Sequence, residues 1–163
     1  MKKIILVLSL FSSITAFAGA SNFSVKCKSA SGRTNLEAWI PGDNPEQSVK
    51  VTVDGKSLTY INQDMLDTLC ANNIDPQKSY PDYIVRDIAA SLEDTKRIVV
   101  LITDGDASEP VLFFTVENLK KKMKRDGSIT GTFQGDLVNT VDPRNLNAEL
   151  PVIALSCSFS YSI

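Results

Sequence analysis

The side chains of this chain that could carry out chemistry include three cysteines, 19 acidic residues and 17 basic residues, but no histidine. Without an imidazole, Ser-His-Asp and Cys-His hydrolysis and His-ligated zinc sites are excluded. The sequence also lacks a glycine-rich phosphate loop and a Gly-x-Ser-x-Gly nucleophile motif. We therefore predict that the protein is not an enzyme and binds no cofactor. A hydrolase that uses Asp or Lys is the least favoured alternative.

The three cysteines predict a single disulfide. Cys27 and Cys157 lie on the apolar faces of the first and last predicted strands, and such strands are often neighbours in a small domain. We expect a Cys27–Cys157 disulfide; a Cys27–Cys70 disulfide and no disulfide at all are the alternatives. In the first case Cys70 is left over, and we expect it to be a buried, unreactive thiol.

An acidic segment that contains Asp104, Asp106 and Glu109 is a weak candidate for a metal site. Calcium prefers oxygen ligands of this kind, but their spacing matches no complete calcium-binding loop, and a solvated Asp-Gly turn accounts for them. The segment Ile98 to Gly105 resembles the strand and Thr-Asp-Gly loop of von Willebrand factor type A domains, where the aspartate helps to hold a divalent cation. That family's Asp-x-Ser-x-Ser motif has no match here. We predict a buried strand followed by an acidic turn, without a metal.

Six residues are candidates for binding a partner. Five of them form a basic run that is typical of a solvated hairpin edge or helix end, or of a patch that binds an anionic envelope polymer or lipid surface. The sixth is the only tryptophan, which could anchor a ligand, although a tryptophan packed under a loop is commoner. The candidates are Trp39, Lys120, Lys121, Lys122, Lys124 and Arg125.

The elements that would position these residues are clearest at the end of the chain. Within residues 151–163, large side chains from Ile153 onward alternate strictly with small ones, four of which are serines. Period-two alternation predicts a strand with one buried face. Such a strand should be held between neighbours, because an unpaired terminus frays. We expect the serine row to face water rather than to form a glycan-binding ladder.

A β-hairpin is predicted for residues 49–53 and 56–61. Asp54 and Gly55 join these two alternating segments, and an Asp-Gly pair suits the positive φ angles of a type I′ turn. This turn would place Val51 opposite Leu58.

Two segments in the middle of the chain have helical spacing. Residues 62–73 carry apolar side chains one helical turn apart, and Asn62 is placed to cap the first turn. Residues 81–94 repeat the pattern with Ile84, Ile88 and Leu92. We therefore predict helices in both segments.

The remaining segments complete a mainly β fold. Residues 98–102, 111–116 and 128–138 are rich in strand-forming residues, whereas 139–150 reads as a loop. Gly131 and Gly135 occupy inward positions of the 128–138 strand, which permits strong coiling. We predict eight strands in an antiparallel barrel or a two-sheet sandwich, with a helical excursion at about 62–94.

The amino terminus predicts export. Two lysines precede an apolar run, and Ala18 and Ala20 provide sites for a signal peptidase, so residues 1–20 read as a signal peptide cleaved after Ala20 or Ala18. The remaining residues, 21–163, would form one domain in the periplasm or outside the cell, without a membrane anchor. This domain has 15 basic and 19 acidic residues, a balance that argues against nucleic acid as the partner.

Together these features predict a monomeric, exported β-domain. Its expected function is that of a binding or inhibitor module for an unknown protein or envelope polymer. A structural or assembly subunit of the cell surface, similar to a pilin, is the alternative.

Overall fold

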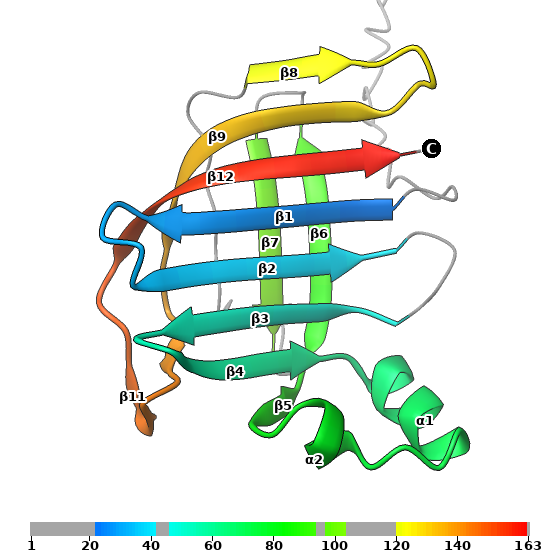
Figure 1. Cartoon of the computed structure of the whole chain (residues 1–163), viewed down its shortest axis with the longest axis vertical. Coiled ribbons are helices and arrows are strands. Elements are labelled where there is room, and N and C mark those ends of the chain that lie inside the picture. The colour runs from blue at the N-terminus through cyan, green and yellow to red at the C-terminus, as the bar shows by residue number, and fades with distance from the viewer. Residues whose placement is uncertain (1–21, 42–45, 94–96, 104–119, 163) are drawn as a thin grey trace, which may run out of the picture.

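The computed structural model describes residues 22–41, 46–93, 97–103 and 120–162 (Figure 1). These residues are mainly β, with two short helices. No helix among them is long and apolar enough to span a membrane. The elements in chain order are β1 (Asn22–Ser29), β2 (Thr34–Ile40), β3 (Ser48–Val53), β4 (Lys56–Ile61), α1 (Gln63–Ala71), α2 (Pro76–Ser79), β5 (Tyr83–Val85), β6 (Asp87–Glu93), β7 (Arg97–Thr103), β8 (Lys120–Met123), β9 (Ile129–Leu137), β10 (Val141–Asp142), β11 (Asn145–Glu149) and β12 (Ile153–Ser162).

Eight strands form one large mixed sheet in the order β5-β4-β3-β2-β1-β12-β9-β8. β12 lies between β1 and β9, so the last strand is held on both sides, as predicted. Its side chains alternate between buried and exposed, and Phe159 and Tyr161 are buried. Among the described residues the outer strands β5 and β8 do not pair with each other, so no closed barrel forms there.

The β3–β4 hairpin has the predicted register. Val51 pairs with Leu58, and the turn residues Asp54 and Gly55 have φ angles of 50° and 82°. Positive φ at both central positions suits the twist of the flanking strands, which explains why the Asp-Gly pair identifies the turn so reliably.

The apolar side chains of the large sheet gather on one face. They belong to one core cluster, to which every long strand of the sheet contributes. Ile88 of β6 is part of the same cluster, and Figure 1 shows the β6–β7 hairpin crossing behind the sheet at a steep angle to its strands. The β6–β7 hairpin therefore packs on the apolar face of the large sheet. The polar side chains that alternate with the apolar ones along the strands of this sheet point to its opposite face.

Gly131 of β9 allows close packing between β9, β12 and the outer strand β8. It lies opposite Phe159 of β12, and a Cβ atom at this position would overlap the Phe159 ring and the backbone oxygen of Lys120. The ring thus occupies the space that a side chain would fill.

The first predicted helix is confirmed and the second is wrong. α1 begins as expected, since the Asn62 side chain accepts a hydrogen bond from the Met65 amide at 3.1 Å. Residues 81–94 instead contain β5 and β6. Ile84, Ile88 and Leu92 are four residues apart, and this spacing fits a helix turn and an alternating strand equally well. Pairing of β5 with β4 and of β6 with β7 decides for strands.

The loop predicted for 139–150 is a small hairpin, β10–β11. The Arg144 guanidinium holds it against the β3–β4 turn, because it bonds Asp142 at 2.8 Å and Asp54 at 2.8 Å. Hydrogen bonds from Arg144 lower the pKa of the Asp142 carboxyl. The Arg144–Asp54 contact joins residues that are 90 positions apart in sequence, so no local pattern predicts it.

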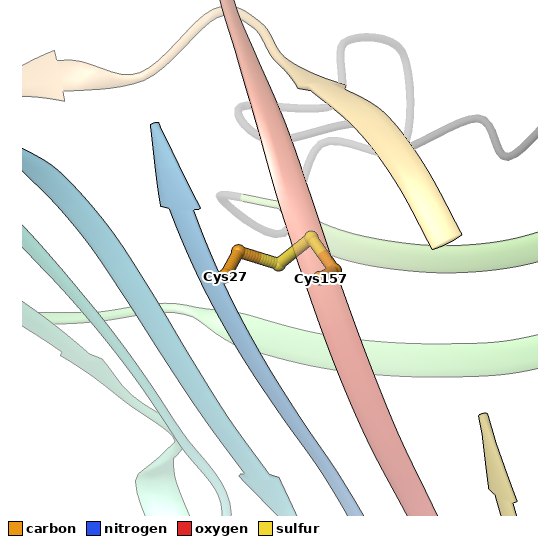
Figure 2. Close-up of a disulfide and its surroundings, with 2 residues drawn as sticks. All are labelled: Cys27 and Cys157. Atoms are coloured by element: carbon orange, nitrogen blue, oxygen red, sulfur yellow. A yellow bond between two sulfur atoms is a disulfide. The ribbon is translucent and has the colours of Figure 1, made fainter. Parts of the chain in front are cut away.

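Cys27 and Cys157 form the predicted disulfide, which Figure 2 shows bridging β1 and β12. The two residues are direct partners in the antiparallel register, with their Cα atoms 4.0 Å apart. Both side chains are buried in the core cluster. Cys70 is free, as expected, but it is exposed on α1, so the prediction of a buried thiol is wrong. Only Leu69 of that helix is buried.

Candidate functional site

The polar side chains of the large sheet form an open face opposite the core. The register aligns them in rows that cross the strands. One row runs from β1 through β12 and β9 to β8 and contains Lys26, Ser158, Thr132 and Lys120. The next row contains Lys28, Ser156 and Gln134.

These two rows line an open hollow of about 930 Å³, which we call the basic hollow. Lys26 and Lys28 stand on β1 and Lys120 stands on β8, so cations flank a floor formed by β12 and β9. The side chains of Phe133 and Cys157 belong to the core on the other face, so these residues can contribute only backbone to the floor. The lining is Lys26, Lys28, Lys120, Thr132, Phe133, Gln134, Ser156, Cys157 and Ser158.

The charged side chains known to line the basic hollow are all positive. Among its described lining residues three are lysines and none is acidic. None of the three forms an ion pair with another described residue, and all three are exposed. Glu37 of β2 lies opposite Lys26 but does not line the hollow. Exposed lysines of this kind can donate charge-assisted hydrogen bonds to an anionic ligand.

The predicted basic run divides between the two sides of the sheet edge. Lys120 and Lys122 pair with threonines of β9 that lie on the open face, whereas Lys121 pairs with Gly131 on the core side. Lys124 and Arg125 belong to the β8–β9 turn. The interpretation of this run as a hairpin edge is confirmed, and only Lys120 lines the basic hollow.

The turn that carries Lys124 and Arg125 is held by Asp126. Its carboxylate accepts hydrogen bonds from the Ser128 hydroxyl at 2.6 Å and from the Ser128 amide at 2.9 Å. These bonds lower the pKa of Asp126. The carboxylate therefore acts within its own turn, away from the basic hollow.

Trp39 lies on the same open face. It keeps 46% of its surface exposed, more than we expected for a tryptophan packed under a loop. The register places it opposite Ser24 of β1, in the row next to that of Lys26.

Sequence reasoning missed Lys26 and Lys28 as site residues. Their signal is the alternation of Ser24, Lys26 and Lys28 with buried residues of β1. That alternation places them on a polar face but does not say which strands lie beside them. The other predicted candidates, Asp104, Asp106 and Glu109, lie outside the described residues. Within the described part of the chain no cluster of acidic or cysteine side chains could hold a metal ion.

Two smaller hollows differ from the basic hollow in the charges that line them. One of about 310 Å³ beside the β3–β4 hairpin combines Lys50 and Lys56 with the carboxylate of Asp82. Another of about 280 Å³ is lined by Asp64 and Asp87, and none of the described residues around it is a cation. Of the three, the basic hollow is the largest, and the charged residues in its described lining are all positive.

Comparisons with protein-family models, with curated proteins and with solved structures found no significant match to this chain.

Proposed function

We propose that this protein is a non-enzymatic binding module whose ligand is an anionic envelope polymer held in the basic hollow. The observation that carries the proposal is the placement of Lys26 and Lys28 on one side, and Lys120 on the other, of a floor of hydroxyl and amide groups. A polymer with repeated negative charges would contact both sides at once.

Multiple contacts matter because each exposed charge pair is weak. A single surface pair contributes only about 0.2–1 kcal/mol, and salt screens it over roughly 8–10 Å. When three lysines bind the same polymer molecule, their small contributions add up, because the second and third contacts form within a complex that the first has already made. The proposal therefore implies binding that weakens steeply as the salt concentration rises.

The first prediction concerns these lysines. The triple variant Lys26→Gln, Lys28→Gln, Lys120→Gln should bind inorganic polyphosphate and polygalacturonate roughly 3- to 100-fold more weakly than the unchanged protein, as the loss of three contacts of about 0.2–1 kcal/mol each implies. Its salt dependence should also be shallower. Isothermal titration calorimetry at two salt concentrations measures both effects.

A matched control separates the site from the overall charge. The triple variant Lys56→Gln, Lys78→Gln, Lys124→Gln removes the same charge from exposed positions outside the basic hollow. It should bind both polymers nearly as well as the unchanged protein. Equal losses in the two triple variants would mean that net charge alone drives binding and would refute the proposed site.

We also infer that residues 1–20 are removed during export and that the mature protein works in the periplasm or outside the cell. The Cys27–Cys157 disulfide supports this compartment, because such bonds persist where the environment is oxidising. Intact-mass measurement of the protein from the periplasmic and culture fractions should give a chain that begins at Ser21 or Gly19. Recovery of the full-length chain from the cytoplasm would contradict the inference.

Of the two architectures that the sequence left open, we favour the two-layer sandwich. Two observations support it: Ile88 of β6 joins the core cluster of the large sheet, and the described outer strands β5 and β8 do not pair. In this arrangement the β6–β7 hairpin lies over the apolar face and leaves the polar face free for a ligand. An experimental structure in which another part of the chain covers the polar face would contradict it.

An assembly subunit is the alternative function, and the outer strand β8 is the feature that bears on it. All four of its residues are exposed, including Met123 at 70%. Three of the four are lysines, and lysine on an outer strand discourages edge-to-edge pairing between molecules. We therefore expect a monomer whose elution volume in size-exclusion chromatography does not change with concentration. Filaments that grow with concentration would favour the assembly subunit instead.

A further inference from the structure

We propose that the polymer is an acidic polysaccharide and that Trp39 stacks on one of its sugar rings beside the basic hollow. This inference rests on the proposed function and names its ligand class. It comes from the position of Trp39, which lines no part of the hollow but extends the same face by one strand.

The register places Trp39 next to the first lysine. Lys26 of β1 pairs with Glu37 of β2, and Trp39 is two residues further along β2 on the same face. Diagonal neighbours of this kind on adjacent strands lie about 7–8 Å apart, within reach of long side chains. A carboxylate on a ring that stacks against the indole would therefore lie within reach of the Lys26 ammonium group.

From Trp39 a row of polar side chains continues across the open face of the sheet toward β8. From β2 to β8 there are four strand spacings, which amount to about 19 Å. Along this path Lys26 is followed by Ser158, Thr132 and then Lys120. Hydroxyl groups between two cations suit a chain that carries both hydroxyl and acidic groups, because each hydroxyl can donate and accept a hydrogen bond.

The exposed aromatic side chain is the feature that distinguishes a polysaccharide from other polyanions. A tryptophan contributes a large apolar surface with one polar N–H group, and the flat C–H face of a sugar ring can cover that surface. A polyphosphate chain has no such face and would use the lysines alone. Nucleic acid also has flat rings, but the net negative charge of the protein opposes its long, densely charged backbone.

The test uses the fact that Trp39 is the only tryptophan in the chain. Its fluorescence therefore reports on this one position without any mutation. Titration of the unchanged protein with polygalacturonate should shift the emission to shorter wavelength as the ring covers the indole. Titration with inorganic polyphosphate should show binding by calorimetry but leave the emission unchanged. Neutral dextran and vesicles that contain phosphatidylglycerol should produce no shift.

Two variants measure the contribution of the indole. Trp39→Ala should weaken polygalacturonate binding by roughly 3- to 10-fold, the change expected for one aromatic contact, and should leave polyphosphate binding unaltered. Trp39→Phe should restore most of the lost affinity, because a smaller ring can still stack. Circular dichroism of both variants confirms that the sheet is intact.

Failure of this inference can be told apart from failure of the proposed function. If polygalacturonate and polyphosphate both bind through the three lysines while the emission never shifts, the stacking role of Trp39 is refuted and the basic hollow stands. A shift caused by the vesicles but not by polygalacturonate would assign the face to a lipid surface and overturn the inference. If neither polymer binds, both proposals fail.

Discussion

Replacement of Cys27 and Cys157 together by alanine should lower the free energy of unfolding by about 2–5 kcal/mol. The two cysteines are 130 residues apart in sequence, so the disulfide removes much of the freedom of the unfolded chain. In the chain-entropy account a loop of this length corresponds to roughly 4–5 kcal/mol, although measured values are often lower. Both side chains are buried, so alanine avoids placing a new polar group in the core. Urea unfolding followed by circular dichroism measures the change.

Cys70→Ala is the matched control for the disulfide variant. Cys70 is exposed and unpaired in the described structure, so its replacement should leave the urea midpoint nearly unchanged. Treatment of the unchanged protein with a thiol reductant should lower its urea midpoint by about as much as the double substitution does. If the double variant unfolded at the same urea concentration as the unchanged protein, strand pairing between β1 and β12 would be sufficient without the disulfide.

Gly131→Val should destabilise the protein by roughly 3 kcal/mol or prevent folding, the upper end of what overpacking costs. The new side chain would enter the space occupied by the Phe159 ring and meet the backbone oxygen of Lys120. Intrinsic preference predicts the opposite sign, because valine favours strands and glycine does not. The direction of the change therefore isolates the steric effect. Thermal unfolding of Gly131→Val and Gly131→Ala measures it, with alanine expected to cost less.

Two further variants test the cause of this destabilisation. In a Phe159→Ala background the ring is absent, so the additional cost of Gly131→Val should shrink in a double-mutant cycle, and the cost that remains reports the overlap with the Lys120 backbone oxygen. Thr132→Val, at the next residue on the exposed face, should be neutral or slightly stabilising. Equal costs of Gly131→Val with and without Phe159 would show that the ring is not the obstacle.

Both stability predictions bear on the proposed site. β1 and β12 carry Lys26, Lys28, Ser156 and Ser158 on one face and the disulfide on the other. Weaker packing on the core side should therefore loosen the spacing between the lysines and the hydroxyl groups. We expect the disulfide and Gly131 variants to lose affinity for polyanions at urea concentrations that leave the unchanged protein folded.

Patterns among residues close in sequence were sufficient to predict several elements. The alternation in β12, the Asp-Gly turn between β3 and β4 and the cap at Asn62 depend on residues close in sequence, and the structure confirms each of them. The Cys27–Cys157 disulfide followed from one further assumption, that the first and last strands are neighbours. These successes share a cause, since backbone conformation responds mainly to the nearest residues.

The errors arise where local patterns were ambiguous. A spacing of four residues suits both a helix and a strand, so residues 81–94 could not be assigned without the strands that pair with them. Cys70 looked apolar within its helix, but α1 buries only Leu69, so the cysteine faces solvent. Neither result was contained in the segment itself.

The sequence alone determined that this is a β-rich chain without histidine, with a lysine run, one tryptophan and cysteines suited to one disulfide. It could not show that Lys26 and Lys28 share a hollow with Lys120, because the strands that carry them are separated by about ninety residues of chain and two intervening strands of the sheet. Strand order is set by the packing of all apolar faces together. The tertiary structure alone therefore brought these cations around one floor and placed Trp39 beside them.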